Sequence, residues 1–273
     1  MKSDIDTAEE HARKSSDIRR RIFGKEHPKV AESLSDLATC AQWKGDDNKA
    51  TALLNKALEI SRRSINAENP LVAGIYQGLG IFAQRRGDYD SAYTYLQEAL
   101  KMLRKLHGTE HPLVAHVEYD LGITFNQRGN AAKAESLLQH ALAVFRNVFG
   151  DQHSRVGGAL FSLSIIRRTE GKYAEAIPLI EEPLAIRTLA FPADHWILCH
   201  TRAGLGHCFL ALGKLAEAEP LLVDNYACLR DRLGKKHRNT LATLRRIIKL
   251  YEQLGAQEKP AEYRAVLESL TEG

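Results

Sequence analysis

The chain has 273 residues, of which 44% are hydrophobic and 26% are charged, and its formal net charge at pH 7 is +4. This composition is typical of a globular protein, and so mild a positive charge gives no argument for nucleic-acid binding. No stretch reaches the roughly 18 consecutive apolar residues that a membrane span needs, and the N-terminal sequence MKSDIDTAEEHARK lacks the apolar core of a secretory signal. We therefore expect a cytoplasmic protein without membrane association.

A 42-residue internal repeat organises the chain. The segment GKEHPKVAESLSDLA, which begins at Gly24, recurs as NAENPLVAGIYQGLG from Asn66 and as GTEHPLVAHVEYDLG from Gly108, and fainter copies follow at the same step. Columns of glycine, leucine or isoleucine, and alanine keep this period throughout. The repeat predicts a segment 1–24 followed by six units, 25–66, 67–108, 109–150, 151–192, 193–234 and 235–273.

The segment 1–24 aligns with the second half of a unit, because Ala8 falls in the column of Ala50. It is predicted to be an N-terminal capping helix or a half repeat cut from a longer array. At the other end, residues 255–270 predict a shorter and more polar helix, as expected of a C-terminal cap.

Each unit is predicted to contain two helices. In the first unit, apolar residues spaced three and four apart predict helices over residues 30–43 and 48–64. Pro28 suits the first turn of the first helix, and Gly45 and Asn66 suit left-handed C-terminal caps. In the fourth and fifth units, Pro178 and Pro220 fall early in the second helix, whereas Pro183 lies deeper and is expected to kink it.

Small residues recur where the two helices of a unit would face each other. Ala38, Gly80, Gly122, Ser164 and Gly206 are expected to face Ala50, Ala92, Ala134, Ala176 and Ala218. Neither helix alone can bury its apolar stripe, so neighbouring units must stack. The predicted fold is all-α, with tandem helix-turn-helix repeats stacked into a right-handed superhelical α-solenoid.

Cysteine and histidine side chains can bind metals or react, but both sets in this sequence are interpreted as structural. The cysteines Cys40, Cys199, Cys208 and Cys228 form no CxxC pair and are expected to be buried free thiols, with a disulfide or metal role as the alternative. A histidine column is expected to help end one helix and start the next, because equivalent positions in stacked repeats lie too far apart to share a metal. It contains His27, His111, His153, His195 and His237, with Asn69 in the remaining place.

The sequence contains no P-loop, no GxSxG elbow, no HExxH and no GxGxxG after a strand. We therefore expect neither catalysis nor a cofactor.

The run HPLVAHVEYDLG, then a glycine and AAKAESLLQHALAVFRNVFG, resembles the 42-residue variety of tetratricopeptide repeat (TPR) of kinesin light chains and many bacterial proteins. The likeness extends from about Ala8 to Leu267. It implies a scaffold that binds a peptide or protein in a concave groove lined by the first helix of each unit. The paired asparagines of the carboxylate-clamp version are absent, which disfavours chaperone C-terminal tails and kinesin-light-chain cargo. That column reads Asp36, Gly78, Asp120, Ser162, Gly204 and Arg246.

The same resemblance implies which residues line the groove. They are Trp43, Ile81, Arg85, His116, Tyr119, Ile123, Asn126, Phe161, Ile165, Arg168, His200, His207, Arg245, Arg246 and Lys249. A wider set on the same face includes Glu32, Ser35, Asp36, Thr39, Gln42, Gln77, Gln84 and Asp120.

Two features of this set bear on the ligand. The isoleucines, with Tyr119 and Phe161, are expected to form an apolar strip, which either serves as a binding floor or packs against the adjacent unit. Charge changes along the face from Glu32 and Asp36 to the basic residues near Arg246, which would orient a partner with an acidic portion.

The leading functional hypothesis is therefore a protein or peptide scaffold. The alternative is a peptide-responsive regulatory domain that changes conformation or oligomeric state when its ligand binds. Self-association through the groove is a third hypothesis. RNA reading is disfavoured, because the positions that would read bases show no regular polar pairs.

Overall fold

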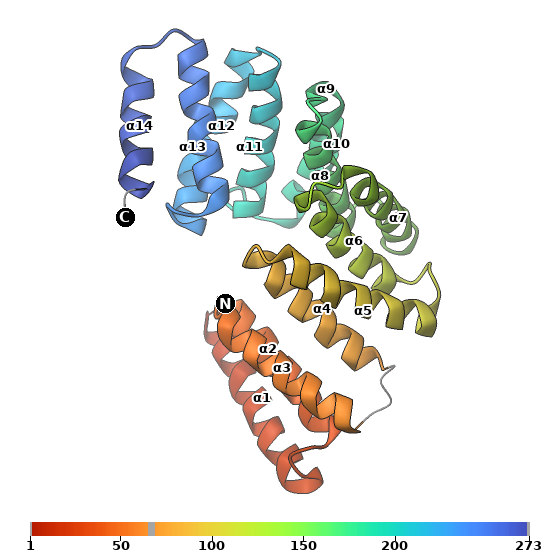
Figure 1. Cartoon of the computed structure of the whole chain (residues 1–273). Helices are drawn as coiled ribbons and strands as arrows, with labels where there is room; N and C mark the ends of the chain where they lie inside the picture. Colours follow the sequence, from red (N-terminus) through yellow and green to blue (C-terminus); the bar gives the residue numbers. More distant parts are fainter. Residues whose placement is uncertain (1, 65–68, 272–273) are drawn as a thin grey trace. The chain divides into compact units, whose positions relative to one another are not determined.

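The computed structural model describes residues 2–64 and 69–271, which form helices joined by short turns (Figure 1). No strand occurs within those residues, so the predicted all-α class is confirmed. The chain divides into two compact bodies, an N-terminal body of residues 1–144 and a C-terminal body of residues 145–273. The cap expected at Asn66 lies outside the described residues.

The helices follow one another with a constant period. In chain order they are α1 (Lys2–Phe23), α2 (Pro28–Trp43), α3 (Asp47–Ser64), α4 (Pro70–Arg85), α5 (Tyr89–His107), α6 (Pro112–Gln127), α7 (Ala131–Phe149), α8 (Ser154–Thr169), α9 (Tyr173–Ala176), α10 (Pro178–Ala190), α11 (Trp196–Ala211), α12 (Leu215–Leu233), α13 (Arg238–Gln253) and α14 (Glu258–Thr271). The first helices of the repeats are α2, α4, α6, α8, α11 and α13, and each begins 42 residues after the one before. None of the described helices combines the length and apolar character needed to cross a bilayer.

A histidine or an asparagine caps the start of each first helix. The Nδ1 atom of His27 accepts a hydrogen bond from the backbone N–H of Lys29 at 3.2 Å, and Asn69 Oδ1 accepts one from Leu71 at 2.9 Å. The same bond is made by His111, His153, His195 and His237. A side chain that satisfies an N–H of the first turn stabilises a helix start. The structural role predicted for this column is confirmed.

Glycine ends the first helices by taking a left-handed conformation. Gly45 has φ +78°, its N–H donates to the carbonyl of Gln42, and the next N–H donates to the carbonyl of Ala41. These bonds satisfy carbonyls that the end of a helix would otherwise leave open. The second helix then begins at once, with Asp46 Oδ1 accepting from the N–H of Lys49 at 2.9 Å.

The small-residue columns let the two helices of a repeat approach closely, as predicted. A Cβ atom at Gly122 would lie 2.7 Å from Cγ of Leu138 and 3.3 Å from the carbonyl oxygen of Ala134. A Cβ atom at Gly80 would likewise lie 2.6 Å from Cγ of Leu96. Both leucines are fully buried, so the space that glycine leaves is filled by the core of the repeat.

The second helix of the fourth repeat is broken, although not where the sequence led us to expect. The break lies at Ile177, between α9 and α10, so that Pro178 starts α10 and Pro183 lies inside it. Each proline lacks the N–H that would bond to the carbonyl four residues earlier. Pro220, at the position equivalent to Pro178, leaves α12 continuous. The break therefore occurs where two prolines stand five residues apart.

The expectation of four free thiols is corrected by a disulfide. Cys199 of α11 and Cys228 of α12 are bonded, with their Cα atoms 6.3 Å apart. Cys40 and Cys208 are free and buried, as predicted. The bonded pair belongs to one repeat, whose two helices pack against each other and bring residues 199 and 228 together.

Candidate functional site

The first helices of the N-terminal body carry an open hollow. It lies between α2 and α4, has a volume of about 350 Å³ and includes three of the expected groove residues, Ser35, Thr39 and Gln42. From α4 it is lined by Gly74 and Gly78, which stand in the columns that hold Glu32 and Asp36 one repeat earlier. Gly74 leaves open space, because a Cβ atom there would meet nothing within 4 Å, whereas a Cβ atom at Gly78 would lie 2.7 Å from Cδ1 of Leu54.

The other expected groove residues of this body differ in their freedom. Trp43 is 60% exposed at the end of α2, and Arg85 is exposed but forms an ion pair with Asp47 at 3.0 Å. The remaining five are partly exposed on α4 and α6, where they offer apolar and polar contacts. They are Ile81, His116, Tyr119, Ile123 and Asn126.

Two glutamines of α4 are occupied by a contact with α6. Gln77 Nε2 donates to Oδ2 of Asp120 at 2.8 Å, and Gln84 Nε2 donates to the backbone oxygen of Asp120 and to Thr124 Oγ1, both at 2.7 Å. Asp120 is buried, and this burial raises the pKa of its carboxyl to about 7 although the bond from Gln77 opposes the rise. These polar residues hold neighbouring repeats together, so a ligand does not find them free.

In the C-terminal body the expected apolar strip is part of the core. Phe161 is only 5% exposed and packs with Leu205 and Cys208 of α11, while Ile165 packs against the same cluster. The ring fits because Gly204 stands opposite it, where a Cβ atom would lie 3.2 Å from the ring carbon Cε2. The packing alternative therefore holds for Phe161, and its use as an open binding contact is corrected.

Positive groups surround the Phe161 ring. The guanidinium of Arg168 lies 5.6 Å from the ring centroid, and that of Arg187 lies 4.9 Å from it. His200 makes an edge contact with the same ring at 5.0 Å. Burial, and then the charge of Arg168 and of other arginines, lowers the pKa of His200 to about 3. The histidine is therefore neutral at pH 7.

The remaining expected residues of this body extend the positive region. His207 of α11 lies against Tyr173, with ring centroids 5.4 Å apart, and burial followed by the charge of Arg246 lowers its pKa to about 3. Arg246 of α13 is partly buried, and burial followed by the charge of Arg168 lowers its pKa to about 10. Arg245 and Lys249 are exposed on α13. The structure thus brings Arg168, His200, His207 and Arg246 into one cluster.

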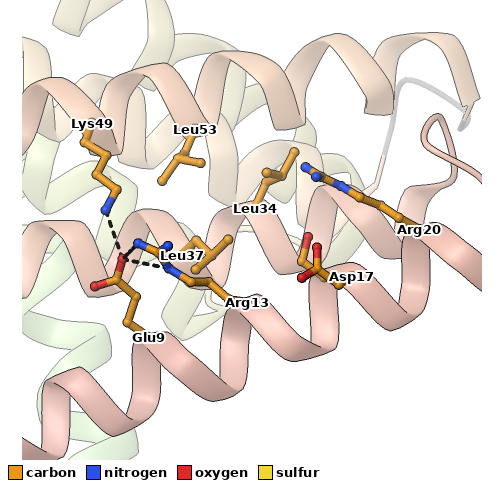
Figure 2. A pocket seen from close by; sticks show the side chains of 9 residues that line it. Glu9, Arg13, Asp17, Arg20, Leu34, Leu37, Lys49 and Leu53 are labelled. Carbon is orange, nitrogen blue, oxygen red and sulfur yellow. Dashed lines mark hydrogen bonds and ion pairs between the residues drawn. The ribbon is translucent and has the colours of Figure 1, made fainter.

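A second pocket was not expected from the sequence. It has a volume of about 330 Å³ and lies between α1, α2 and α3, with Leu34, Leu37 and Leu53 on one side and charged side chains at its rim (Figure 2). Figure 2 shows Glu9 bonded to Arg13 and Lys49, at 2.6 and 2.9 Å.

The columns of the repeat explain why this pocket exists. Ala12 and Ser16 of α1 stand where the second helix of the first repeat has Leu54 and Leu58. The Ser16 hydroxyl is buried without a hydrogen-bond partner among the described residues. The two missing leucines were the signal in the sequence. Glu9 accepts hydrogen bonds from the three cations Lys44, Arg13 and Lys49, and these bonds lower the pKa of its carboxyl well below the usual range.

Within the described part of the chain, no three or more histidine, cysteine, aspartate or glutamate side chains are arranged to hold a metal ion. The surfaces described above are an open hollow in the N-terminal body and a positive cluster in the C-terminal body.

Comparison with known proteins agrees with this architecture. The tetratricopeptide repeat family model matches residues 2–63, 71–145 and 119–188. Comparison with curated protein sequences found no match.

Several solved structures are similar. BtubC (BKLC) from P. vanneervenii is 26% identical, with a TM-score of 0.65 over 84% of this chain and 92% of that one. Kinesin-light-chain TPR-like repeats from Podosopora anserina are 22% identical, with a TM-score of 0.58 over 75% of this chain and 97% of that one. A Rap protein complexed with competence and sporulation factor is 18% identical, with a TM-score of 0.67 over 99% of this chain and 71% of that one. The last two likenesses are those of the fold.

The first helices begin every 42 residues and are capped alike, and the family model matches more than half of the length of the chain. This chain therefore belongs to the tetratricopeptide repeat family.

Proposed function

We propose that this protein is a non-catalytic interaction scaffold that binds a peptide or a segment of another protein along the face of its first helices. The observation that carries the proposal is the hollow between α2 and α4, lined by residues of that face. Grooves that take extended segments combine an open shape with a few apolar anchors and polar groups at the sides.

The side chains near this hollow have suitable chemistry. Ser35, Thr39 and Gln42 offer hydroxyl and amide groups, and Ile81 and Ile123 continue the column of Thr39 on the next two first helices with partly exposed apolar surface. Partly exposed anchors of this kind lose water when a ligand covers them, which favours binding. The tetratricopeptide repeats and the likeness to a Rap protein solved with competence and sporulation factor support a binding role.

A steric block tests the proposal. Gly74 is exposed on α4, and a Cβ atom there would meet nothing within 4 Å, so Gly74→Tyr places a ring in the hollow without disturbing the core. Thr94→Tyr, at an exposed position on α5 away from the hollow, is the matched control. Circular dichroism checks that both variants fold.

The readout is selection from a display library of random and proteome-derived peptides. We expect the wild-type chain and the Thr94→Tyr variant to enrich a common motif, and the Gly74→Tyr variant to lose at least tenfold in affinity for it. Equal enrichment by all three chains would show that the ligand does not use this hollow.

A further inference from the structure

One small side chain of α1 borders the pocket between α1, α2 and α3. Ser16 stands in a column that holds Leu58 and Leu100 in the next two repeats, and both leucines are buried. Leu37, which lines the pocket, is partly exposed, whereas its counterpart Leu79 is only 1% exposed. The space that a leucine fills at the next repeat junctions is therefore open at the first one. Its volume of about 330 Å³ lies within the range of about 300–1,000 Å³ that small-molecule sites occupy.

The last repeat junction has an aromatic ring in the equivalent place. Its residues in the columns of Ser16, Leu34, Leu37 and Leu53 stand five periods later and are Tyr226, Leu244, Ile247 and Tyr263. They pack in one core cluster of α12, α13 and α14. Tyr226 is only 8% exposed, and its ring lies edge-on to that of Tyr263 with the centroids 6.4 Å apart. Three helices arranged in this way can therefore hold a phenol ring at the position that Ser16 leaves open.

An arginine at the rim of the pocket is placed to contact such a ring. Arg20 lines the pocket together with Leu34, and Figure 2 shows it extending from α1 toward this leucine. In the next repeat the same two columns hold Arg62 and Tyr76. The guanidinium of Arg62 lies 5.7 Å from the centroid of the Tyr76 ring, and its Nη2 donates to the phenolic oxygen at 2.6 Å. A phenol bound beside Leu34 would offer Arg20 the ring face and the oxygen that Tyr76 offers Arg62.

The charged side chains of the rim give no preference for a charged ligand. Glu9 accepts hydrogen bonds from Arg13 and Lys49, at 2.6 and 2.9 Å, and so is already paired with cations. The other two charged residues of the rim, Asp17 and Arg20, have opposite signs. Water that filled the pocket would leave the leucines of its floor wet, whereas a ring would cover them.

We propose that the pocket between α1, α2 and α3 binds a small, uncharged, single-ring phenol. The ring lies against Leu34, Leu37 and Leu53, and the hydroxyl is within reach of Arg20. Burial of the ring provides most of the affinity, and the guanidinium adds a hydrogen bond and a cation–π contact. The lining residues of this pocket differ from those of the hollow between α2 and α4, so the proposal does not rest on the proposed function.

The first test uses p-cresol, which is the tyrosine side chain as a free molecule, and toluene, which lacks the hydroxyl. Each is added to the full chain while the signals of ¹³C-labelled leucine methyl groups are followed by NMR. We expect p-cresol to shift the signals of Leu34, Leu37 and Leu53 and to leave that of Leu189, which is 81% exposed in the C-terminal body, unchanged. Because one neutral hydrogen bond separates the probes, p-cresol should bind about fivefold more tightly than toluene. A Leu37 signal that does not move up to the solubility limit of p-cresol, or equal binding of the two probes, would overturn the proposal.

A cavity-filling variant locates the binding. Ser16→Leu introduces the residue of the next repeat and should weaken p-cresol binding at least tenfold, because the new side chain occupies the pocket. His11→Leu adds the same side chain at an exposed position of α1 and should change the affinity less than twofold. Circular dichroism checks that both variants fold. Unchanged affinity in a folded Ser16→Leu variant would show that p-cresol binds elsewhere.

A second pair of variants tests the contact with the hydroxyl and does not depend on how Ser16→Leu folds. Arg20→Met removes the donor and keeps an apolar side chain, so p-cresol and toluene should then bind within about twofold of each other. Arg21→Met, at the exposed neighbouring position, should keep the preference for p-cresol. If Arg20→Met also keeps it, Arg20 does not recognise the hydroxyl and the assignment to a phenol is wrong.

A capped peptide, Gly-Gly-Tyr-Gly-Gly, separates a free phenol from a tyrosine side chain of another protein. Figure 2 shows the bond between Lys49 of α3 and Glu9 of α1 joining the two helices at one end of the pocket. A free ring therefore enters more easily than a ring attached to a backbone, and we expect the peptide to bind more weakly than p-cresol. Binding of the peptide at least tenfold more tightly than p-cresol would mean that the pocket holds a partner's side chain, and the small-molecule assignment would be wrong.

Discussion

Asp120 makes the stability of the N-terminal body depend on pH. Its carboxyl is buried on α6 and accepts a bond from Gln77, and burial raises its pKa from 3.8 to about 7. The folded chain then holds this proton more tightly than the unfolded chain does. The stability it contributes is therefore fully present below about pH 4, is lost as the pH rises towards 7, and stays lost above that value.

The size of the effect follows from the shift. A rise in pKa of about three units corresponds to about 4 kcal/mol of folding stability between low and high pH, at 1.36 kcal/mol for each unit. Asparagine at position 120 has the shape of the protonated acid, and its Oδ1 can still accept the bond from Gln77. We therefore expect Asp120→Asn to be more stable than the wild-type chain at pH 8.5 by on the order of 2–4 kcal/mol, with the difference shrinking as the pH falls to 4.5.

Urea unfolding followed by circular dichroism at pH 4.5, 6, 7 and 8.5 measures this difference. Asp36→Asn, an exposed residue in the same column of the repeat, controls for the removal of one negative charge. A difference between Asp120→Asn and the wild-type chain that is the same at all four pH values would refute the reasoning, because it would show that Asp120 does not change its charge over this range.

Two further predictions concern packing and cross-linking. Gly122→Ala should destabilise the chain by about 1–3 kcal/mol, because the new methyl group meets buried Leu138. Gly74→Ala, on open helix surface, should stabilise the chain by about 0.5–1 kcal/mol. Thermal unfolding measures both changes, and reversed signs would contradict the packing described at Gly122. Cys199 and Cys228 lie 29 residues apart, so reduction of their disulfide should lower the free energy of unfolding by up to about 3.5 kcal/mol, because the unfolded chain gains entropy. A melting temperature that reductant leaves unchanged, with complete reduction shown by thiol labelling, would contradict this prediction.

The helices could be predicted from the sequence because their determinants are local and repeat. A capping side chain such as His27 and a glycine such as Gly45 act within a few residues of themselves, so their columns mark helix ends directly. The close approach of the paired helices at Gly122 was equally visible, since the size of one residue determines it.

The exposure of the candidate groove residues was harder to predict, because the alignment treats equivalent positions as having equivalent surroundings. Phe161 shares its column with the partly exposed Tyr119, yet it is buried because the next first helix has Gly204 opposite the ring. Gln84 and Arg168 likewise share a column, but the hydrogen bonds to the next first helix are those from Gln84 to Asp120 and Thr124 of α6. What decides exposure at these positions is a residue 36 to 43 positions further on, which a column on its own does not consider.

The two bodies differ in chemistry at the same columns of the repeat. The N-terminal body uses amides to join α4 to α6 and has a largely uncharged hollow, whereas in the C-terminal body the residue in the column of Gln84 is Arg168, whose guanidinium lies over the ring of Phe161.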